Sequence, residues 1–219
     1  MPLTLHFHPL SSFCHKALIA LYENDTPFER RIVNLMDPAE AAAFKKLWPC
    51  GQFPVLQDGN RSIPESSIII EHLGLEHPGR VRLIPEDPRR ALDVRMLDRF
   101  FDGYVMTPMQ RIVFDFIRAP ENRDPKGVAD AHALLDTAYR WLDAELAGRE
   151  WAVGSAFSLA DCAGGPSLFY ADWVHPIDPA LATLRAYRKR VLARPSFARA
   201  VDEARPYRSY FPPGAPDRD

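Results

Sequence analysis

This sequence of 219 residues has few cysteines, no long apolar run and almost no excess of either charge. The three cysteines, Cys14, Cys50 and Cys162, form neither a disulfide framework nor a metal-binding spacing, which favours a reducing compartment. A transmembrane helix needs about 18 consecutive apolar residues, and no apolar run approaches this length. The N-terminus also lacks the basic and apolar segments of a secretory signal, so we expect a cytoplasmic protein without membrane association.

Charge and histidine spacing exclude further classes of function. Lysine and arginine number 27 against 29 aspartates and glutamates, and a formal net charge of -2 provides no general attraction to nucleic acid or anionic lipid. We interpret the densest basic stretch, residues 185–190, as the solvated face of a helix. Six histidines show no metal-binding pattern, so we expect structural or surface roles for them and no metal. These six are His6, His8, His72, His77, His132 and His175.

Residues 1–79 predict a small α/β domain. Alternating apolar residues over 3–7 predict a strand, and Ser11-Ser12 before an apolar-periodic run predicts a helix start. Further elements are predicted by the same kinds of signal: a strand over 28–33, a helix opened by Asp37-Pro38, a hairpin around Asp58-Gly59 and a helix from residue 65. The resulting order, β-α-β-α-β-β-α, can place a small sheet between helices.

The chain changes character after Gly79. We expect a linker over 80–88, an all-helical domain over 89–205 with a kink at Pro108, and a tail over 206–219 that lies loosely on the surface. The pair Gly164-Gly165 falls inside an expected helix that begins at Ser158. Because glycine costs about 1 kcal/mol against alanine in a helix, the pair indicates close helix packing.

The first candidate site is Ser11-Ser12-Phe13-Cys14, where a strand leads into a helix N-terminus. Free N–H groups and the helix dipole favour an anion there, and a hydroxyl can donate to a thiolate. A thiol with a pKa of about 8.5 needs about 2.7 kcal/mol to lower that pKa by two units. One hydroxyl donor supplies about 1.5–3 kcal/mol and the helix end about 0.3–1 kcal/mol. The alternative is that both serines only cap the helix.

Cys14 falls inside that helix, and we expect it to be a packing residue. The Ser-x-x-Cys spacing matches the redox Cys-x-x-Cys spacing with the first sulfur replaced by oxygen, so this motif cannot perform dithiol chemistry. A thiol oxidoreductase that uses Cys14 or Cys50 is therefore disfavoured.

Two further segments could hold a peptide. In Trp48–Leu56, a proline directly before a strand implies an edge or a turn, and a cis Phe53-Pro54 bond would expose the Phe53 backbone to a peptide laid alongside. Sequence alone does not justify the cis form. Pro64-Glu65-Ser66-Ser67 opens a helix, where Ser66 could bind a carboxylate and Glu65 an ammonium group. The alternative is that Glu65 and Ser66 only favour the helix start.

The order and spacing of these segments resemble the cytosolic glutathione transferase family, most closely its serine-type, theta- and zeta-like members. The resemblance rests on Ser11-x-x-Cys14, Pro49-x-Gly51-Gln52-Phe53-Pro54-x-Leu56, Asp58-Gly59, Glu65-Ser66-x-x-Ile69 and the capping motif Phe157-Ser158-Leu159-Ala160-Asp161. It covers about residues 2–205. It implies a thioredoxin-like N-terminal domain, a C-terminal helical bundle, and a homodimer that binds glutathione as co-substrate without another cofactor.

The resemblance also implies residue roles. Ser11 would activate the thiol of glutathione, the Phe53 backbone would pair with its cysteinyl part ahead of a cis Pro54, and Glu65 with Ser66 would hold its γ-glutamyl end. Gln52, His15 or Lys16 could reach the glycyl carboxylate. The electrophile would lie between the domains against an apolar wall. The Tyr104 hydroxyl is a possible hydrogen-bond donor to the electrophile. Candidate wall residues are Phe13, Phe101, Tyr104, Val105, Pro108 and Met109. The alternative is that these residues form the ordinary core of the helical domain or a dimer interface.

The expected activity is conjugation of glutathione to small electrophiles, as in detoxification. A glutathione-dependent peroxidase or isomerase, and a non-catalytic binding or interaction protein on the same scaffold, stay open as alternatives. Generic apolar residues form the expected wall of the electrophile site, so they favour no single class of electrophile. Whether Ser11, Ser12 or Cys14 contacts the sulfur is also open from the sequence.

Overall fold

The N-terminal part of the computed structural model, which describes residues 2–219, is a four-stranded sheet with three helices. The strands are β1 (Leu3–Phe7), β2 (Phe28–Ile32), β3 (Val55–Asp58) and β4 (Arg61–Pro64), in the spatial order β2-β1-β3-β4. β1 pairs in parallel with β2, whereas the β1–β3 and β3–β4 pairs are antiparallel. The helices are α1 (Ser12–Glu23), α2 (Pro38–Leu47) and α3 (Ser66–Glu76). The predicted β-α-β-α-β-β-α order is confirmed.

The C-terminal part is helical. Its α-helices are α4 (Pro88–Phe100), α5 (Thr107–Phe116), α6 (Pro125–Glu145), α7 (Leu159–Val174), α8 (Ala182–Leu192) and α9 (Pro195–Ala204). Three short elements complete it: the π-helix η1 (Phe101–Met106) and the 3₁₀-helices η2 (Pro120–Asn122) and η3 (Arg205–Tyr210). Within residues 2–219, no helix combines the length and apolar character that crossing a membrane requires.

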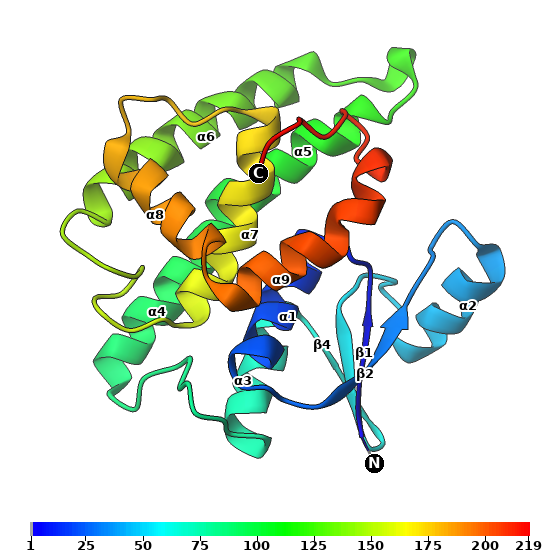
Figure 1. Cartoon of the computed structure of the whole chain (residues 1–219). Coiled ribbons are helices and arrows are strands. Elements are labelled where there is room, and N and C mark those ends of the chain that lie inside the picture. The colour runs from blue at the N-terminus through cyan, green and yellow to red at the C-terminus, as the bar shows by residue number, and fades with distance from the viewer. Residues whose placement is uncertain (1) are drawn as a thin grey trace.

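Helix α1 lies at the centre of the molecule. Figure 1 shows it between the sheet and the helices α7 and α9, with α2 on the outer side of the sheet. Almost every side chain of α1 is therefore buried, including the polar residues His15 and Lys16. One continuous apolar core extends from the sheet through α1 into the helical part.

The segment before Pro108 is a π-helix, where the sequence predicts only a kink. Proline has no N–H to donate to the preceding turn, so a regular α-helical hydrogen bond cannot form at this residue. The Thr107 N–H donates to the Asp102 carbonyl five residues earlier, and the Thr107 hydroxyl donates to the same oxygen at 2.9 Å. The wider turn accommodates the missing donor, and α4, η1 and α5 remain one continuous helical path.

Helix α7 is buried along almost its whole length. The predicted capping box is confirmed: the Ser158 side chain accepts from the third helical N–H, and the Asp161 carboxylate accepts from the Ser158 N–H at 2.9 Å. The close packing predicted at Gly164-Gly165 is also confirmed. A Cβ on Gly164 would lie 2.7 Å from the Tyr187 hydroxyl, so only glycine allows α8 to approach this closely.

The C-terminal segment does not lie loosely on the surface, contrary to the expectation from its composition. Residues 205–210 form η3, and the following Phe211 is buried with 7% of its surface exposed. Asp219 pairs with two arginines of η3, while Arg218 pairs with Asp172 of α7. The proline and charged residues of this segment indicated irregular structure. Its attachment by ion pairs could not be predicted, because the partners come from parts of the chain that only the fold places beside it.

Candidate functional site

Ser11 is the N-cap of α1. Its backbone is extended, with φ -82° and ψ 124°, and its Oγ accepts from the Cys14 N–H at 3.4 Å. The side chain is half-buried, whereas Ser12 is inside the first turn and only 6% exposed. Of the two serines, Ser11 therefore has its hydroxyl at the accessible mouth of the helix.

The loop that carries Ser11 is fixed by hydrogen bonds from the residues around it. The Ser11 N–H donates to the His8 carbonyl at 3.0 Å, and the Leu10 N–H donates to His8 Nδ1 at 3.2 Å. His15 Nε2 lies 2.6 Å from the Pro9 carbonyl oxygen, which identifies Nε2 as the protonated nitrogen. Complete burial lowers the pKa of His15 to about 4, so the imidazole is neutral near pH 7.

His15 therefore cannot reach a glycyl carboxylate, and this corrects the role that the resemblance implied for it. Its side chain points into the core behind the loop, between α1 and the aromatic rings of Tyr170 and Phe197. Its role in this structure is to hold the Pro9 carbonyl and thereby the path of the chain into Ser11.

Cys14 is completely buried, which confirms its prediction as a packing residue. Burial raises the pKa of its thiol to about 12, so the thiol stays protonated and unreactive near pH 7. Cys162 is also fully buried, and burial raises the pKa of its thiol well above the ordinary value. Only Cys50, among the three cysteines, is exposed.

The Phe53-Pro54 peptide bond is cis, as the resemblance implied. The described residues form no hydrogen bond to the backbone N–H or carbonyl of Phe53, which precedes the first ladder residue of β3. The Phe53 ring stacks on His8 with 6.0 Å between centroids. The loop before Ser11 and the loop before Pro54 are thus neighbours, with exposed Gln52 beside them.

Glu65 has an unusual backbone, with φ 68° and ψ 116°. A residue with a side chain pays about 1–3 kcal/mol for such a conformation, and strain of this kind concentrates at functional sites. Glu65 is the N-cap of α3 but makes no side-chain cap hydrogen bond, so the first N–H groups of α3 keep their capacity to bind a ligand. Glu65 is exposed, whereas Ser66 at the helix start is buried.

A buried ion cluster lies directly behind this helix start. Lys16 Nζ is 2.5 Å from Asp98 Oδ1, 2.8 Å from Asp102 Oδ2 and 2.8 Å from Ser67 Oγ. The Ser67 hydroxyl in turn donates to Asp98 at 2.9 Å. Burial is the main cause that raises the pKa of Asp102, although the Lys16 ammonium acts in the opposite direction. Lys16 therefore links α1 and α3 to α4 and η1, and it is not free to bind a carboxylate of a ligand.

The residues predicted to form the electrophile wall do not share one surface. Phe101 and Val105 expose none of their surface and belong to the core, and Met109 and Pro108 are also buried. Phe13, in the first turn of α1, is half-buried. Helical periodicity identified η1 as an apolar segment but could not tell its core face from an open face.

Tyr104 is 51% exposed and stacks on Phe100 with 4.9 Å between centroids. Phe100 stacks in turn on Trp141 of α6 at 4.2 Å. Tyr104 therefore belongs to this aromatic group of η1, α4 and α6 and makes no hydrogen bond to Ser11.

Tyr207 of η3 is a neighbour of the site that no feature of the sequence indicates. Its ring meets the His8 ring edge-on, with 5.4 Å between centroids, next to the Ser11 loop. No local pattern could indicate this contact, because it depends on the fold returning the C-terminal segment to the first strand.

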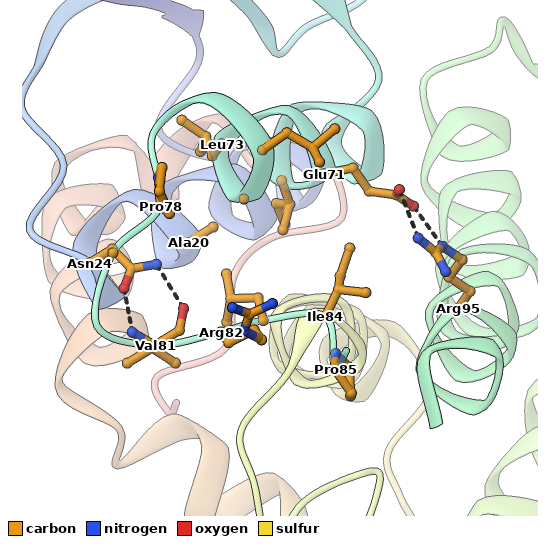
Figure 2. Close-up of a pocket in the computed structure, with 15 residues that line it drawn as sticks. Ala20, Asn24, Glu71, Leu73, Pro78, Val81, Arg82, Ile84, Pro85 and Arg95 are labelled. Carbon is orange, nitrogen blue, oxygen red and sulfur yellow. Dashed lines mark hydrogen bonds and ion pairs between the residues drawn. The ribbon is translucent and has the colours of Figure 1, made fainter. Parts of the chain in front are cut away.

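A separate cavity of about 260 Å³ lies between α3 and residues 78–85, and Figure 2 shows its lining. Asn24 exchanges two hydrogen bonds with the Val81 backbone on one side, and Glu71 pairs with Arg95 on the other. None of the predicted glutathione-binding or wall residues lines it, so it is distinct from the site around Ser11.

Comparison with known proteins gives consistent matches. Residues 5–81 match the family model "Glutathione S-transferase, N-terminal domain", and residues 105–195 match "Glutathione S-transferase, C-terminal domain". A glutathione S-transferase-like protein, LUC7, of a Fusarium species is 30% identical over 157 residues, 70% of this chain and 67% of the relative. A probable maleylacetoacetate isomerase of Vibrio cholerae is 28% identical over 217 residues, 94% of this chain and 98% of the relative. The crystal structure of a glutathione S-transferase from Methylobacterium radiotolerans in complex with glutathione sulfonate has a TM-score of 0.81 at 28% identity, over 92% of this chain and 95% of that one.

Proposed function

The chain belongs to the glutathione S-transferase family, and we propose that it conjugates glutathione to small electrophiles with the thiolate stabilised by Ser11. The observation that carries this proposal is the position of the Ser11 hydroxyl. It caps α1 as an acceptor from Cys14, so its own O–H is not used by that contact. The loop beside it carries the cis Phe53-Pro54 bond and the unpaired Phe53 backbone.

The segments around the site can each bind a different part of one tripeptide. The Phe53 N–H and carbonyl would pair with the cysteinyl residue as an added strand. The uncapped N-terminus of α3, with Ser66, would bind the γ-glutamyl carboxylate, and the exposed Glu65 carboxylate would bind the ammonium group. Gln52, exposed next to Phe53, would contact the peptide from the same loop. The structure of the M. radiotolerans protein with glutathione sulfonate supports a ligand of this type.

The chemical step is a nucleophilic attack by sulfur. The hydroxyl of Ser11 donates to the thiolate, which lowers the thiol pKa and raises the fraction of nucleophile at pH 7. The sulfur lone pair forms a C–S bond with the electrophilic carbon, and a leaving group departs with its bonding electrons or a proton adds to the product. Water accepts the thiol proton. We expect the active protein to be a cytoplasmic homodimer.

Glutathione-dependent cis–trans isomerisation is a second candidate. The V. cholerae relative, named a probable maleylacetoacetate isomerase, matches this chain over nearly its full length. Reversible addition of the same thiolate to a conjugated double bond would allow rotation before the sulfur leaves, so the same Ser11 would serve both reactions.

The test is a Ser11→Ala variant, with Ser12→Ala as the matched control and Ser11→Thr as the hydroxyl-retaining variant. Loss of one hydroxyl donor to an anion is worth about 1.5–3 kcal/mol, so kcat/KM should fall about 10- to 100-fold in Ser11→Ala. The pKa of bound glutathione, read from thiolate absorbance against pH, should rise in Ser11→Ala and stay unchanged in Ser12→Ala. Full activity and an unchanged pKa profile in Ser11→Ala would remove the proposed mechanism.

A further inference from the structure

Three potential metal ligands converge at the end of the sheet opposite the Ser11 loop. Asp58 ends β3, His72 lies in α3, and His77 follows the last residue of α3. His72 Nε2 is 2.9 Å from Asp58 Oδ2, and His77 Nε2 is 2.6 Å from the same oxygen. All three donor atoms lie within 4.8 Å of one another, and no other such group occurs among residues 2–219.

We propose that Asp58, His72 and His77 bind one divalent transition-metal ion, Zn²⁺ by preference, with water in the fourth position. Two imidazoles and one carboxylate suit zinc, which takes histidine nitrogen at about 2.0–2.1 Å and carboxylate oxygen at about 2.0–2.2 Å. In a tetrahedron, ligand atoms at those bond lengths lie about 3.4 Å apart. The two observed separations from Asp58 are shorter by 0.5 and 0.8 Å, a change that small side-chain rotations can supply.

The local fold holds these residues ready. The His77 N–H donates to the Leu73 carbonyl at 3.0 Å, so His77 continues the turn that ends α3. Asp58 begins the tight turn between β3 and β4, where Gly59 has φ 58°. Both backbones are therefore anchored to regular structure before a ligand arrives, which reduces the ordering cost of binding.

Access and burial are also suited to an ion. The His72 side chain is 7% exposed, whereas His77 and Asp58 are 34% and 24% exposed. The buried histidine would provide a fixed ligand, and the two partly exposed ligands would leave an entry path and a position for water. The bound ion would fasten the C-terminal end of α3 to the β3–β4 hairpin.

A second group of two histidines and one carboxylate, formed by His132, Asp136 and His175, lacks the convergent geometry of the proposed metal site. His132 Nδ1 lies 2.9 Å from His175 Nδ1, and His175 Nε2 lies 2.7 Å from Asp136. His175 thus directs its two nitrogens to opposite sides, and the three residues have no common centre. It offers a matched control, because it has the same residue types without the convergent geometry.

The same three side chains could instead form only a proton-mediated network, in which both imidazole N–H groups donate to Asp58. The two arrangements differ in composition, since zinc replaces the N–H protons that the network requires. The histidine spacing in the sequence predicts no metal, and nothing in the proposed reaction uses this site. A negative result here would leave the glutathione proposal intact.

The experiment uses the full chain without an affinity tag, stripped with a chelator and titrated with Zn²⁺ by calorimetry and with Co²⁺ by visible absorbance. We expect one ion per chain, and tetrahedral Co²⁺ bands. His77→Ala should weaken binding by about tenfold or more, since even indirect partners of metal ligands contribute about 10- to 100-fold. His132→Ala should bind as the wild type does.

Asp58→Asn is the second variant, in case His77→Ala does not fold, and it keeps the side-chain shape while removing the anionic ligand. Circular dichroism and urea denaturation report the fold of each variant. Absence of stoichiometric binding by the wild type would overturn the proposal. Equal affinity of the wild type and either folded ligand variant would overturn it as well, as would equal weakening by His132→Ala.

Discussion

Replacement of Lys16 by methionine would expose the energetic role of the buried ion cluster. The Lys16, Asp98 and Asp102 side chains are 1%, 3% and 8% exposed, and the Lys16 ammonium lies within 2.8 Å of both carboxylates. Methionine has a similar length and keeps the apolar part of the packing, so the change removes mainly the charge and its hydrogen bonds. The two carboxylates would then face each other in the core without a cation.

The expected loss of folding stability is large for a single substitution. Removing one partner of a buried ion pair costs about 3–5 kcal/mol, because the remaining charge is uncompensated, and a domain has only about 5–15 kcal/mol of stability. Arg99 cannot take over the role of the lysine, since it lies 3.6 Å from Asp102 and is 71% exposed to solvent. Ser67 also loses its Lys16 donor, so we expect a higher KM for glutathione if Glu65 and Ser66 bind it as proposed.

Urea denaturation followed by circular dichroism measures the loss, with Lys46→Met on the exposed face of α2 as control. The control should change the free energy of unfolding by less than about 0.5 kcal/mol. Neutralising the whole cluster in the variant Lys16→Met/Asp98→Asn/Asp102→Asn should recover more than half of the loss, because no buried charge then remains. A cost below about 1 kcal/mol for Lys16→Met, or no recovery in the triple variant, would refute the electrostatic reasoning.

Three further substitutions test the packing of the helices and the buried histidine. Gly164→Ala should destabilise the protein by about 1–3 kcal/mol, because its Cβ would lie 2.7 Å from the Tyr187 hydroxyl. Gly74→Ala in α3, whose Cβ would meet nothing within 4 Å, should stabilise it by about 0.5–1 kcal/mol; denaturation curves that place both variants on the same side of the wild type would contradict the packing analysis. For His15, the pKa is about 4 in the folded chain against 6.5 for the ordinary group, so the unfolded state binds more protons between these values and stability should fall as pH drops from 6.5 to 4, by up to about 3 kcal/mol. His15→Asn should remove that part of the pH dependence, and an unaltered slope of stability against pH would show that another group causes it.

The glutathione-site segments show how far local sequence reasoning extends. Ser11, Asp37, Ser158 and Asp161 were recognisable as helix-start residues, since a cap involves only residues three or four apart. The directions of His15 and Lys16 were not recognisable. Apolar periodicity identifies a helix with one buried face, but α1 lies between the sheet on one side and α7 with α9 on the other.

The electrophile wall shows the same limit on a larger scale. Phe101 and Val105 sit in an apolar segment before Pro108, and a pattern alone cannot tell whether such residues meet a substrate or a neighbouring helix. The structure places both in the core, beside α7, whose glycines allow the close approach. The π-helix could not be predicted from the sequence either. The missing N–H of Pro108 predicts an irregular helix at this position, but it does not predict that the irregularity is a π-helical turn.

By itself, the amino-acid sequence determined the order of helices and strands, the two capped helix starts at Ser11 and Ser158, and the resemblance that led to the family. These features depend on hydrogen bonds and side-chain periodicities within a few consecutive residues. Only the tertiary structure decided which polar groups meet: Lys16 with two aspartates, Tyr207 with His8, and Asp58 with His72 and His77. Such encounters join residues that are distant in the chain, and they depend on how the sheet and helices pack around α1.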